Sequence, residues 1–113
     1  MQRILIVDDY EAVLESMRRL FRDTEYEVVV VNDREALLVL ERGESFDLII
    51  SDVDMIVIRG EELIKRFKAK HPAMRALLTS GGKRPECDEA DGFFEKPFDF
   101  EALRDLVRNT LNA

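Results

Sequence analysis

Short apolar runs alternate along the chain with segments of helical periodicity. Four of the runs span residues 3–7, 27–31, 47–51 and 75–79, and a weaker fifth spans 92–96. They are rich in branched residues and apolar on both faces, which is typical of parallel strands covered on both sides. This βαβα alternation predicts an α/β fold, a doubly wound parallel sheet with right-handed crossovers.

The segments between the runs have the pattern of amphipathic helices. One helix is predicted by the spacing of Val13, Leu14, Met17, Leu20 and Phe21. Similar stripes begin at residues 63 and 100, and residues 32–35 have the pattern of a capping box. The crossover between residues 79 and 93 is the exception, because its 13 residues include three glycines and a proline. We therefore predict a fourth helix that is shortened or replaced by an irregular loop.

Length and charge narrow the class of protein. The 113 residues, 46% of them hydrophobic, suit one domain spanning 1–113 with one core. A net charge of −7 disfavours nucleic acid and favours a cation or a basic partner. Cys87 is the single cysteine, and the chain shows neither a signal peptide nor an apolar run long enough to span a membrane. We expect a cytoplasmic protein.

Polar side chains gather where the predicted strands end. They are Asp8 and Asp9 after the first run, Asp52 and Asp54 after the third, Thr79 at the end of the fourth, and Lys96 at the end of the fifth. Ligands of such sheets bind at the carboxyl ends of the strands. Carboxylates gathered there repel one another unless a cation lies among them, and Mg²⁺ is the simplest candidate. A hydroxyl and an ammonium group would complete a cradle for a phosphoryl group.

In this order, the motifs resemble those of the receiver domains of two-component response regulators. The matching stretches are ILIVDDY, DLIISDVDM with Gly60 eight residues after Asp52, LLTSGG and FFEKPF. The resemblance covers nearly the whole chain and implies a flavodoxin-like sheet of five strands in the order 2-1-3-4-5. It implies a phosphoacceptor that is not an enzyme, with Mg²⁺ as cofactor and a histidine kinase or histidine phosphotransfer protein as partner.

The resemblance assigns roles to the acidic residues. Asp52 would be the phosphoacceptor, Asp9 would bind Mg²⁺ directly, and Asp8 would act through the water shell of the ion. Asp54 would supply its main-chain carbonyl to the metal and leave its side chain at the mouth of the site. Ile56 stands where receivers usually have a proline, so we expect a more mobile loop after the acceptor.

The resemblance also assigns roles to the remaining residues of the site. Lys96 would pair first with Asp52 and then with the phosphoryl oxygens, and the peptide bond from Lys96 to Pro97 would be cis. Thr79 would bond to the phosphoryl group, and Phe93 would occupy the aromatic switch position without a hydroxyl. A depleted fourth helix would weaken the face that many transcription-factor receivers use to dimerise, so we expect a monomer or a weak dimer without nucleic acid or membrane partners.

Other interpretations stay open. Asp8 and Asp9 suit the capping of the helix that follows them. The D-V-D sequence matches a phosphatase of the haloacid dehalogenase type, with Asp52 as nucleophile and Asp54 as general acid, although in that class the pair ends the first strand of the core. A degenerate receiver that acts only as a docking surface is the third possibility, and the intact Asp9, Asp52, Thr79 and Lys96 argue against it.

Overall fold

A five-stranded parallel sheet forms the centre of the molecule. The computed structural model describes residues 1–97 and 99–113. The strands are β1 (Arg3–Val7), β2 (Glu27–Val31), β3 (Leu48–Asp52), β4 (Arg75–Ser80) and β5 (Gly92–Glu95). Their order is β2-β1-β3-β4-β5, and every neighbouring pair is parallel. The predicted fold class and strand order are therefore confirmed.

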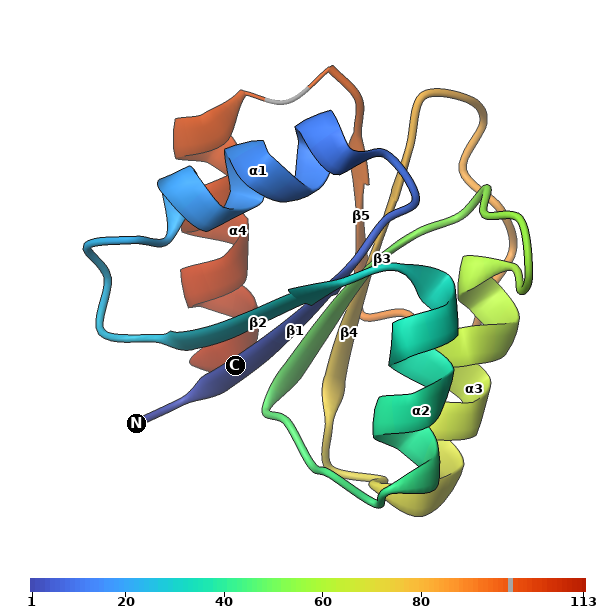
Figure 1. Cartoon of the computed structure of the whole chain (residues 1–113). Coiled ribbons are helices and arrows are strands. Elements are labelled where there is room, and N and C mark those ends of the chain that lie inside the picture. Colours follow the sequence, from blue (N-terminus) through green and yellow to red (C-terminus); the bar gives the residue numbers. More distant parts are fainter. Residues whose placement is uncertain (98) are drawn as a thin grey trace.

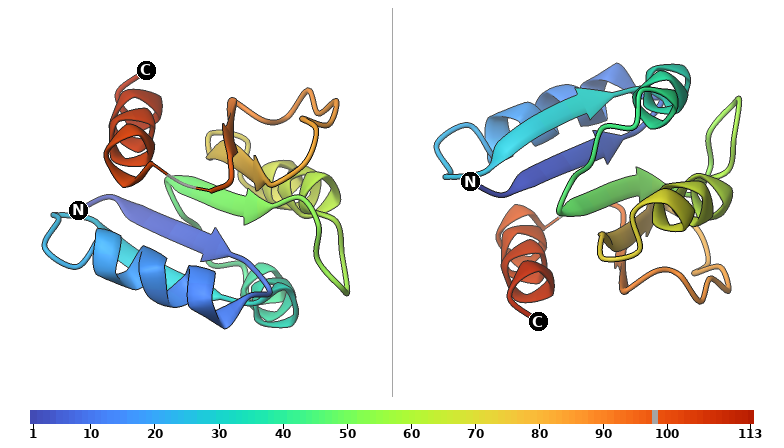
Figure 2. Two further views of the ribbon diagram at one scale, coloured as in Figure 1. Left: turned by 90° about the horizontal axis from the view of Figure 1, so that it is seen from above. Right: turned by 90° about the horizontal axis from the view of Figure 1, so that it is seen from below.

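Helices cover both faces of the sheet. They are α1 (Glu11–Leu20), α2 (Asp33–Glu41), α3 (Gly60–Lys70) and α4 (Phe100–Leu111). Helices α1 and α4 lie on one face and α2 and α3 on the other (Figures 1 and 2). Within the described residues, no helix combines the length and apolar character needed to cross a membrane.

The sheet separates two hydrophobic clusters. Leu5 of β1 and Ile49 of β3 pack in the cluster that contains Phe67 of α3, whereas Ile4 and Ile50 pack with residues of α1 and α4. Successive side chains of a strand point to opposite faces, so each central strand contributes to both clusters. This double burial explains why the central strands are apolar on both faces.

Helix α2 begins at the predicted capping box and is followed by a glycine. The side chain of Asn32 accepts the Glu35 N–H at 2.9 Å, and the Glu35 carboxylate accepts the Asn32 N–H at 3.1 Å, which completes the capping box. Gly43 follows the helix with a φ of 75°, a conformation that favours glycine. The chain therefore leaves α2 through a turn at Gly43 before it enters β3.

The crossover from β4 to β5 contains no helix, so the expectation of a shortened fourth helix is corrected to its alternative, an irregular loop. Every residue of 81–91 is described and none is helical. The glycine pair disfavours helix formation, and Pro85 has no N–H to donate. Asp91 anchors the far end: its N–H donates to the Ala76 carbonyl at 2.7 Å, and its carboxylate accepts the Ala76 N–H at 2.8 Å and pairs with Lys68 at 3.0 Å.

Candidate functional site

The predicted polar residues converge at the carboxyl edge of the sheet, which we call the rim and define as Asp8, Asp9, Asp52, Thr79 and Lys96. Asp8 directly follows β1 and is only 2% exposed. Its Oδ1 accepts the Tyr10 N–H at 2.9 Å, and its Oδ2 pairs with Lys96 Nζ at 2.8 Å. One rim carboxylate is thus already bound to the rim ammonium group.

Asp52 ends β3 beside the same lysine. It is 4% exposed, and its Oδ1 lies 3.4 Å from Lys96 Nζ. Lys96 follows β5, where its N–H donates to the Ser80 carbonyl at 2.8 Å, and its peptide bond to Pro97 is cis, as predicted. Lys96, at the end of β5, therefore reaches past β4 to the end of β3.

The electrostatics of this cluster are unbalanced. Burial raises the pKa of Asp52, and the charge of Asp8 raises it further, whereas Lys96 opposes both effects. Burial alone would lower the pKa of Lys96, but its hydrogen bond to Asp8 and the two negative charges raise it above its ordinary value. Two carboxylates thus share one ammonium group, and an added cation would relieve their repulsion.

Asp9 contacts the loop that follows β3 and does not cap α1. Its Oδ2 accepts the Ile56 N–H at 2.7 Å, while α1 begins after Tyr10 without a side-chain cap. Burial raises the pKa of Asp9, the Ile56 N–H opposes this, and the charge of Asp33 adds to it. The Oδ1 atom of Asp9 is buried without a hydrogen-bond partner among the described residues. An unpartnered carboxylate oxygen beside other acids fits a cation.

These residue types are suited to Mg²⁺, although their present arrangement is not a closed metal site. Hard divalent ions prefer oxygen ligands, and carboxylates supply them here. Among the described residues, no three acidic, histidine or cysteine side chains are gathered closely enough to hold a metal ion.

Gly60 allows the chain to pass close to the main chain of Asp52. A Cβ atom at this residue would lie 2.1 Å from the main-chain oxygen of Asp52. The Gly60 N–H donates to the Val53 carbonyl at 3.0 Å and closes the base of the loop. The side chain of Asp54 is exposed and pairs with Arg59 at 3.4 Å. The close approach to the main-chain oxygen of Asp52 thus requires a glycine at position 60.

The tip of this loop is held by two carboxylates, contrary to the mobility expected from Ile56. Besides the bond from Ile56 to Asp9, the Val57 N–H donates to Asp33 Oδ2 at 2.6 Å. A proline at position 56 has no N–H and could not form the first of these bonds. The residue that departs from the family pattern therefore supplies a tether.

Sequence reasoning did not identify Asp33 as part of this region. Its only sequence signal is an acid in the first turn of a helix, which is a common position for aspartate. The contact with Val57 joins residues 24 positions apart, and no local pattern encodes it. Tyr10 was also missed; its ring centroid lies 5.8 Å from Lys96 Nζ.

The remaining predicted residues lie on β4 and β5. Thr79 is buried near the end of β4, in register with Asp52 on one side and with Phe94 on the other. Phe93 is partly buried against the cluster beneath α2 and α3, and the Arg84 guanidinium lies 5.9 Å from its ring centroid. The hydroxyl role of Thr79 and the switch role of Phe93 stay predictions.

Comparisons with known proteins agree with this geometry. The family model of the response regulator receiver domain matches residues 4–108. The chain is 32% identical over 114 residues to the transcriptional regulatory protein FixJ of Bradyrhizobium diazoefficiens, covering 96% of this chain and 56% of FixJ. The chain thus spans little more than half the length of that relative.

Solved structures show the same fold. A CheY-like receiver domain protein from Methanospirillum hungatei superimposes with a TM-score of 0.89 at 28% identity, covering 99% of this chain and 94% of that one. TrrA from Thermotoga maritima, solved in complex with Mg²⁺ and BeF, has a TM-score of 0.84 at 26% identity, with 97% and 99% covered. The family model matches residues 4–108, and the solved structures share the five-stranded sheet. The chain therefore belongs to the response regulator receiver domains of two-component systems.

Proposed function

We propose that this receiver accepts a phosphoryl group on Asp52 from a histidine kinase or a histidine phosphotransfer protein. Receivers are signalling phosphoacceptors rather than enzymes. The observation that carries the proposal is the position of the buried Asp52 carboxylate, which shares Lys96 with Asp8 at the rim. We treat residues 1–113 as one receiver domain that works in the cytoplasm.

Asp52 is the nucleophile of the proposed reaction. One of its carboxylate oxygens attacks the phosphorus of a phosphohistidine in line, and a new O–P bond forms as the N–P bond breaks. The electron pair of the broken bond leaves with the imidazole. Water later attacks the phosphorus of the aspartyl phosphate, releases inorganic phosphate and restores the carboxylate.

Four aspartates would hold Mg²⁺ beside the nucleophile. Asp9 and Asp52 offer carboxylate oxygens, Asp54 offers its main-chain carbonyl, and Asp8 acts through bound water. When bound, Mg²⁺ neutralises charge on the phosphoryl oxygens. The unpartnered Oδ1 of Asp9 supports this assignment. TrrA was solved with Mg²⁺ and BeF, which supports it by likeness.

Lys96 and Thr79 complete the proposed cradle. Lys96 already lies 3.4 Å from Asp52, so its ammonium group can pass from the carboxylate to a phosphoryl oxygen with little movement. The Thr79 side chain lies on the neighbouring strand in register with Asp52 and would donate its hydroxyl to the phosphoryl group. Phe93 would respond by repacking, since it has no hydroxyl to bond.

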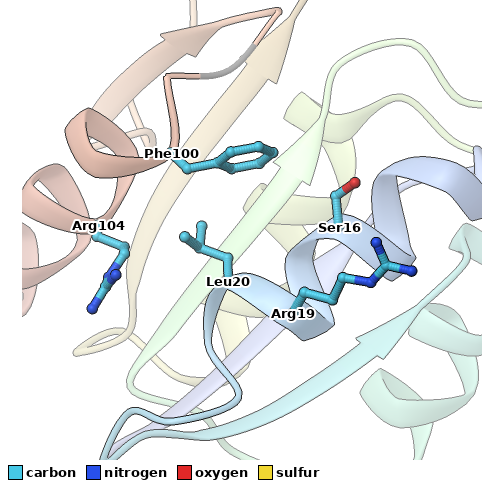
Figure 3. Close-up of a pocket in the computed structure, with 5 residues that line it drawn as sticks. All are labelled: Ser16, Arg19, Leu20, Phe100 and Arg104. Carbon is cyan, nitrogen blue, oxygen red and sulfur yellow. The ribbon is translucent and has the colours of Figure 1, made fainter.

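The phosphodonor docks over α1 and the loops of the rim in this proposal. A groove of about 370 Å³ lies between α1 and α4. It is lined by Ser16, Arg19, Leu20, Phe100 and Arg104 (Figure 3). Leu20 provides an apolar contact, and the two guanidinium groups favour an acidic partner surface. The loop crossover between β4 and β5 supports a monomer or weak dimer. The net charge of −7 argues against a nucleic acid partner.

Phosphorylation of Asp52 can be tested directly. We expect acetyl phosphate with Mg²⁺ to add one phosphate per chain, detected by intact mass and mapped to Asp52. Asp52→Asn should abolish the modification, because an amide is a far poorer nucleophile. Asp47→Asn, at the opposite edge of the sheet, is the matched control and should be modified normally. Repeated turnover of phosphate esters by the wild type would instead support the phosphatase alternative.

A further inference from the structure

Asp33 is a buried carboxylate that reaches from a helix to the phosphoacceptor loop. It lies in the first turn of α2, where the helix dipole favours a negative charge. Such acids are ordinarily exposed, but Asp33 is only 4% exposed. Its Oδ1 accepts the neighbouring Arg34 N–H at 2.9 Å, and its Oδ2 accepts the Val57 N–H at 2.6 Å. Helix capping alone does not explain the second bond.

Asp33 and Asp9 bind consecutive N–H groups of the same loop. Asp9 accepts from Ile56 and Asp33 from Val57, so two like charges lie side by side beneath the loop tip. Two neighbouring carboxylates repel each other, and a buried ionised group is costly without hydrogen bonds. The two N–H groups offset part of this cost, which ties the acidic pair and the loop to each other.

The loop is also closed at its base. The Gly60 N–H donates to the Val53 carbonyl at 3.0 Å, and the Val53 N–H donates to the Thr79 carbonyl at 2.9 Å. The main chain from 53 to 57 is therefore fixed at both ends, directly after Asp52. This stretch includes Asp54, whose carbonyl is the proposed metal ligand.

We propose that Asp33 is a positioning residue for the phosphoacceptor site. By holding the Val57 N–H, it fixes the main chain of residues 53–57 directly after Asp52, a stretch that includes the Asp54 carbonyl as the proposed ligand of the metal ion. The inference rests on the proposed function of Asp52 and adds a residue from α2 to it. Asp33 itself touches neither the nucleophile nor the phosphoryl group.

The test compares two substitutions at Asp33. Asp33→Ala removes the acceptor, so the Val57 amide should lose its protection from hydrogen exchange. At saturating Mg²⁺ and acetyl phosphate, the rate of Asp52 modification should fall about tenfold, the size expected for the loss of one charge-assisted hydrogen bond. Asp33→Asn keeps an acceptor oxygen and should restore both protection and rate. Saturating Mg²⁺ removes any effect of the lost charge on metal affinity.

Asn32→Ala is the matched control, because it breaks the capping box one residue away and leaves the bond between Asp33 and Val57 in place. It should weaken α2 without changing the protection of Val57 or the rate. An equal loss in Asn32→Ala would overturn the inference by assigning the effect to helix stability. If Asp33→Ala does not fold, Asp33→Ser offers a polar side chain too short to reach the loop, with the same expectations.

The experiment separates the two proposals. If the wild type is modified and Asp33→Ala is modified equally fast with Val57 still protected, the inference fails and the proposed function stands. If the wild type takes no phosphoryl group, the proposed function fails and the positioning role fails with it. Hydrogen exchange needs no phosphodonor, so the tether itself is measured in either case.

Discussion

The two edges of the sheet differ in how their charged side chains are compensated. At the amino edge, the Arg3 guanidinium pairs with Glu27 at 3.2 Å and Glu44 at 3.6 Å and lies 4.4 Å from the centroid of the Phe46 ring. The Arg3 N–H also donates to Asp47 Oδ2 at 2.7 Å. These ionised side chains are partly exposed and meet opposite charges. The amino edge therefore needs nothing further to be stable.

At the rim the charges are buried and unequal. Asp8 and Asp52 share Lys96, while Asp9 lies beside Asp33, and within the described residues both of these carboxylates accept from main-chain N–H groups. Charge that is buried without compensation lowers the stability of the folded state unless a ligand repays it. The amino edge thus balances its charges with neighbouring side chains, whereas the rim keeps an excess of buried negative charge that the cation of the proposed function would compensate.

The largest expected difference concerns glycines near the two edges. Gly60→Ala places a Cβ atom 2.1 Å from the Asp52 carbonyl, so we expect a loss of about 3 kcal/mol in the free energy of unfolding, at the upper end for overpacking. Gly43→Ala has open space and only its positive φ to oppose it, which costs roughly 1 kcal/mol. Urea denaturation measures both values. Equal losses would mean that the backbone contact at Gly60 does not matter.

Added Mg²⁺ should stabilise the folded protein through the rim residues and not through the amino edge. At an ion concentration tenfold above Kd, binding to the folded state raises the free energy of unfolding by about 1.4 kcal/mol. Asp9→Asn should remove most of this gain and Asp8→Asn less, because Asp9 is the proposed direct ligand and Asp8 is proposed to act through bound water. Asp47→Asn at the amino edge should keep the full gain. Thermal denaturation with and without Mg²⁺ checks the ranking, and a full gain in Asp9→Asn would contradict it.

Neutralising Asp52 should stabilise the metal-free protein. The pKa of this carboxyl is raised by folding, so its ionised form is less stable in the folded state than in the unfolded state. This loss of stability from ionised Asp52 is absent below the ordinary aspartate pKa of 3.8. It grows as the pH rises from there through the raised pKa of the folded state. Asp52→Asn should therefore raise the free energy of unfolding of the metal-free protein at pH 7.

The same stability gain should shrink as the medium is acidified, because the wild-type carboxyl becomes protonated in both states. Lys96 keeps Asp8 as a partner at 2.8 Å in the variant, so its own charge stays compensated. Urea denaturation at several pH values follows this trend. A variant that is less stable than the wild type at pH 7 would show that Lys96 outweighs burial at Asp52.

The smallest expected effect lies at the amino edge. Glu27→Gln removes one partner of Arg3, whose remaining contacts are intact, and exposed ion pairs contribute only about 0.2 to 1 kcal/mol. The loss should diminish further in high salt, since salt screens exposed charges. Denaturation at two salt concentrations measures it. A large, salt-independent loss would show that the amino edge is no less delicate than the rim.

The sequence predicted what local patterns encode. Strand runs, helix stripes and the Asn32 capping box each lie within a few neighbouring residues, and the order of the motifs identified the family. The family resemblance implied that Lys96 pairs with Asp52, and the two lie 3.4 Å apart. The shorter contact of Lys96 with Asp8, at 2.8 Å, was not predicted.

Contacts set by tertiary packing could not be predicted in the same way. Asp9 meets Ile56 across 47 positions and Asp33 meets Val57 across 24, and no periodicity announces either bond. Ile56 stands where the family usually has a proline, and this difference suggested a looser loop. The hydrogen bond that the Ile56 N–H donates to Asp9 became apparent only in the structure. The β4–β5 crossover was correctly identified as a weak place for a helix, but residue preferences did not decide between a short helix and a loop.

That crossover also has an evolutionary consequence. It is attached at one end through the Gly82 N–H to Ser80 Oγ at 3.0 Å and at the other through Asp91 to Ala76. Between these anchors, doubling the length of a flexible loop costs only about 0.6 kcal/mol in closure entropy. Insertions and deletions can therefore accumulate there over generations while the strand ends that carry Thr79 and Lys96 keep their register.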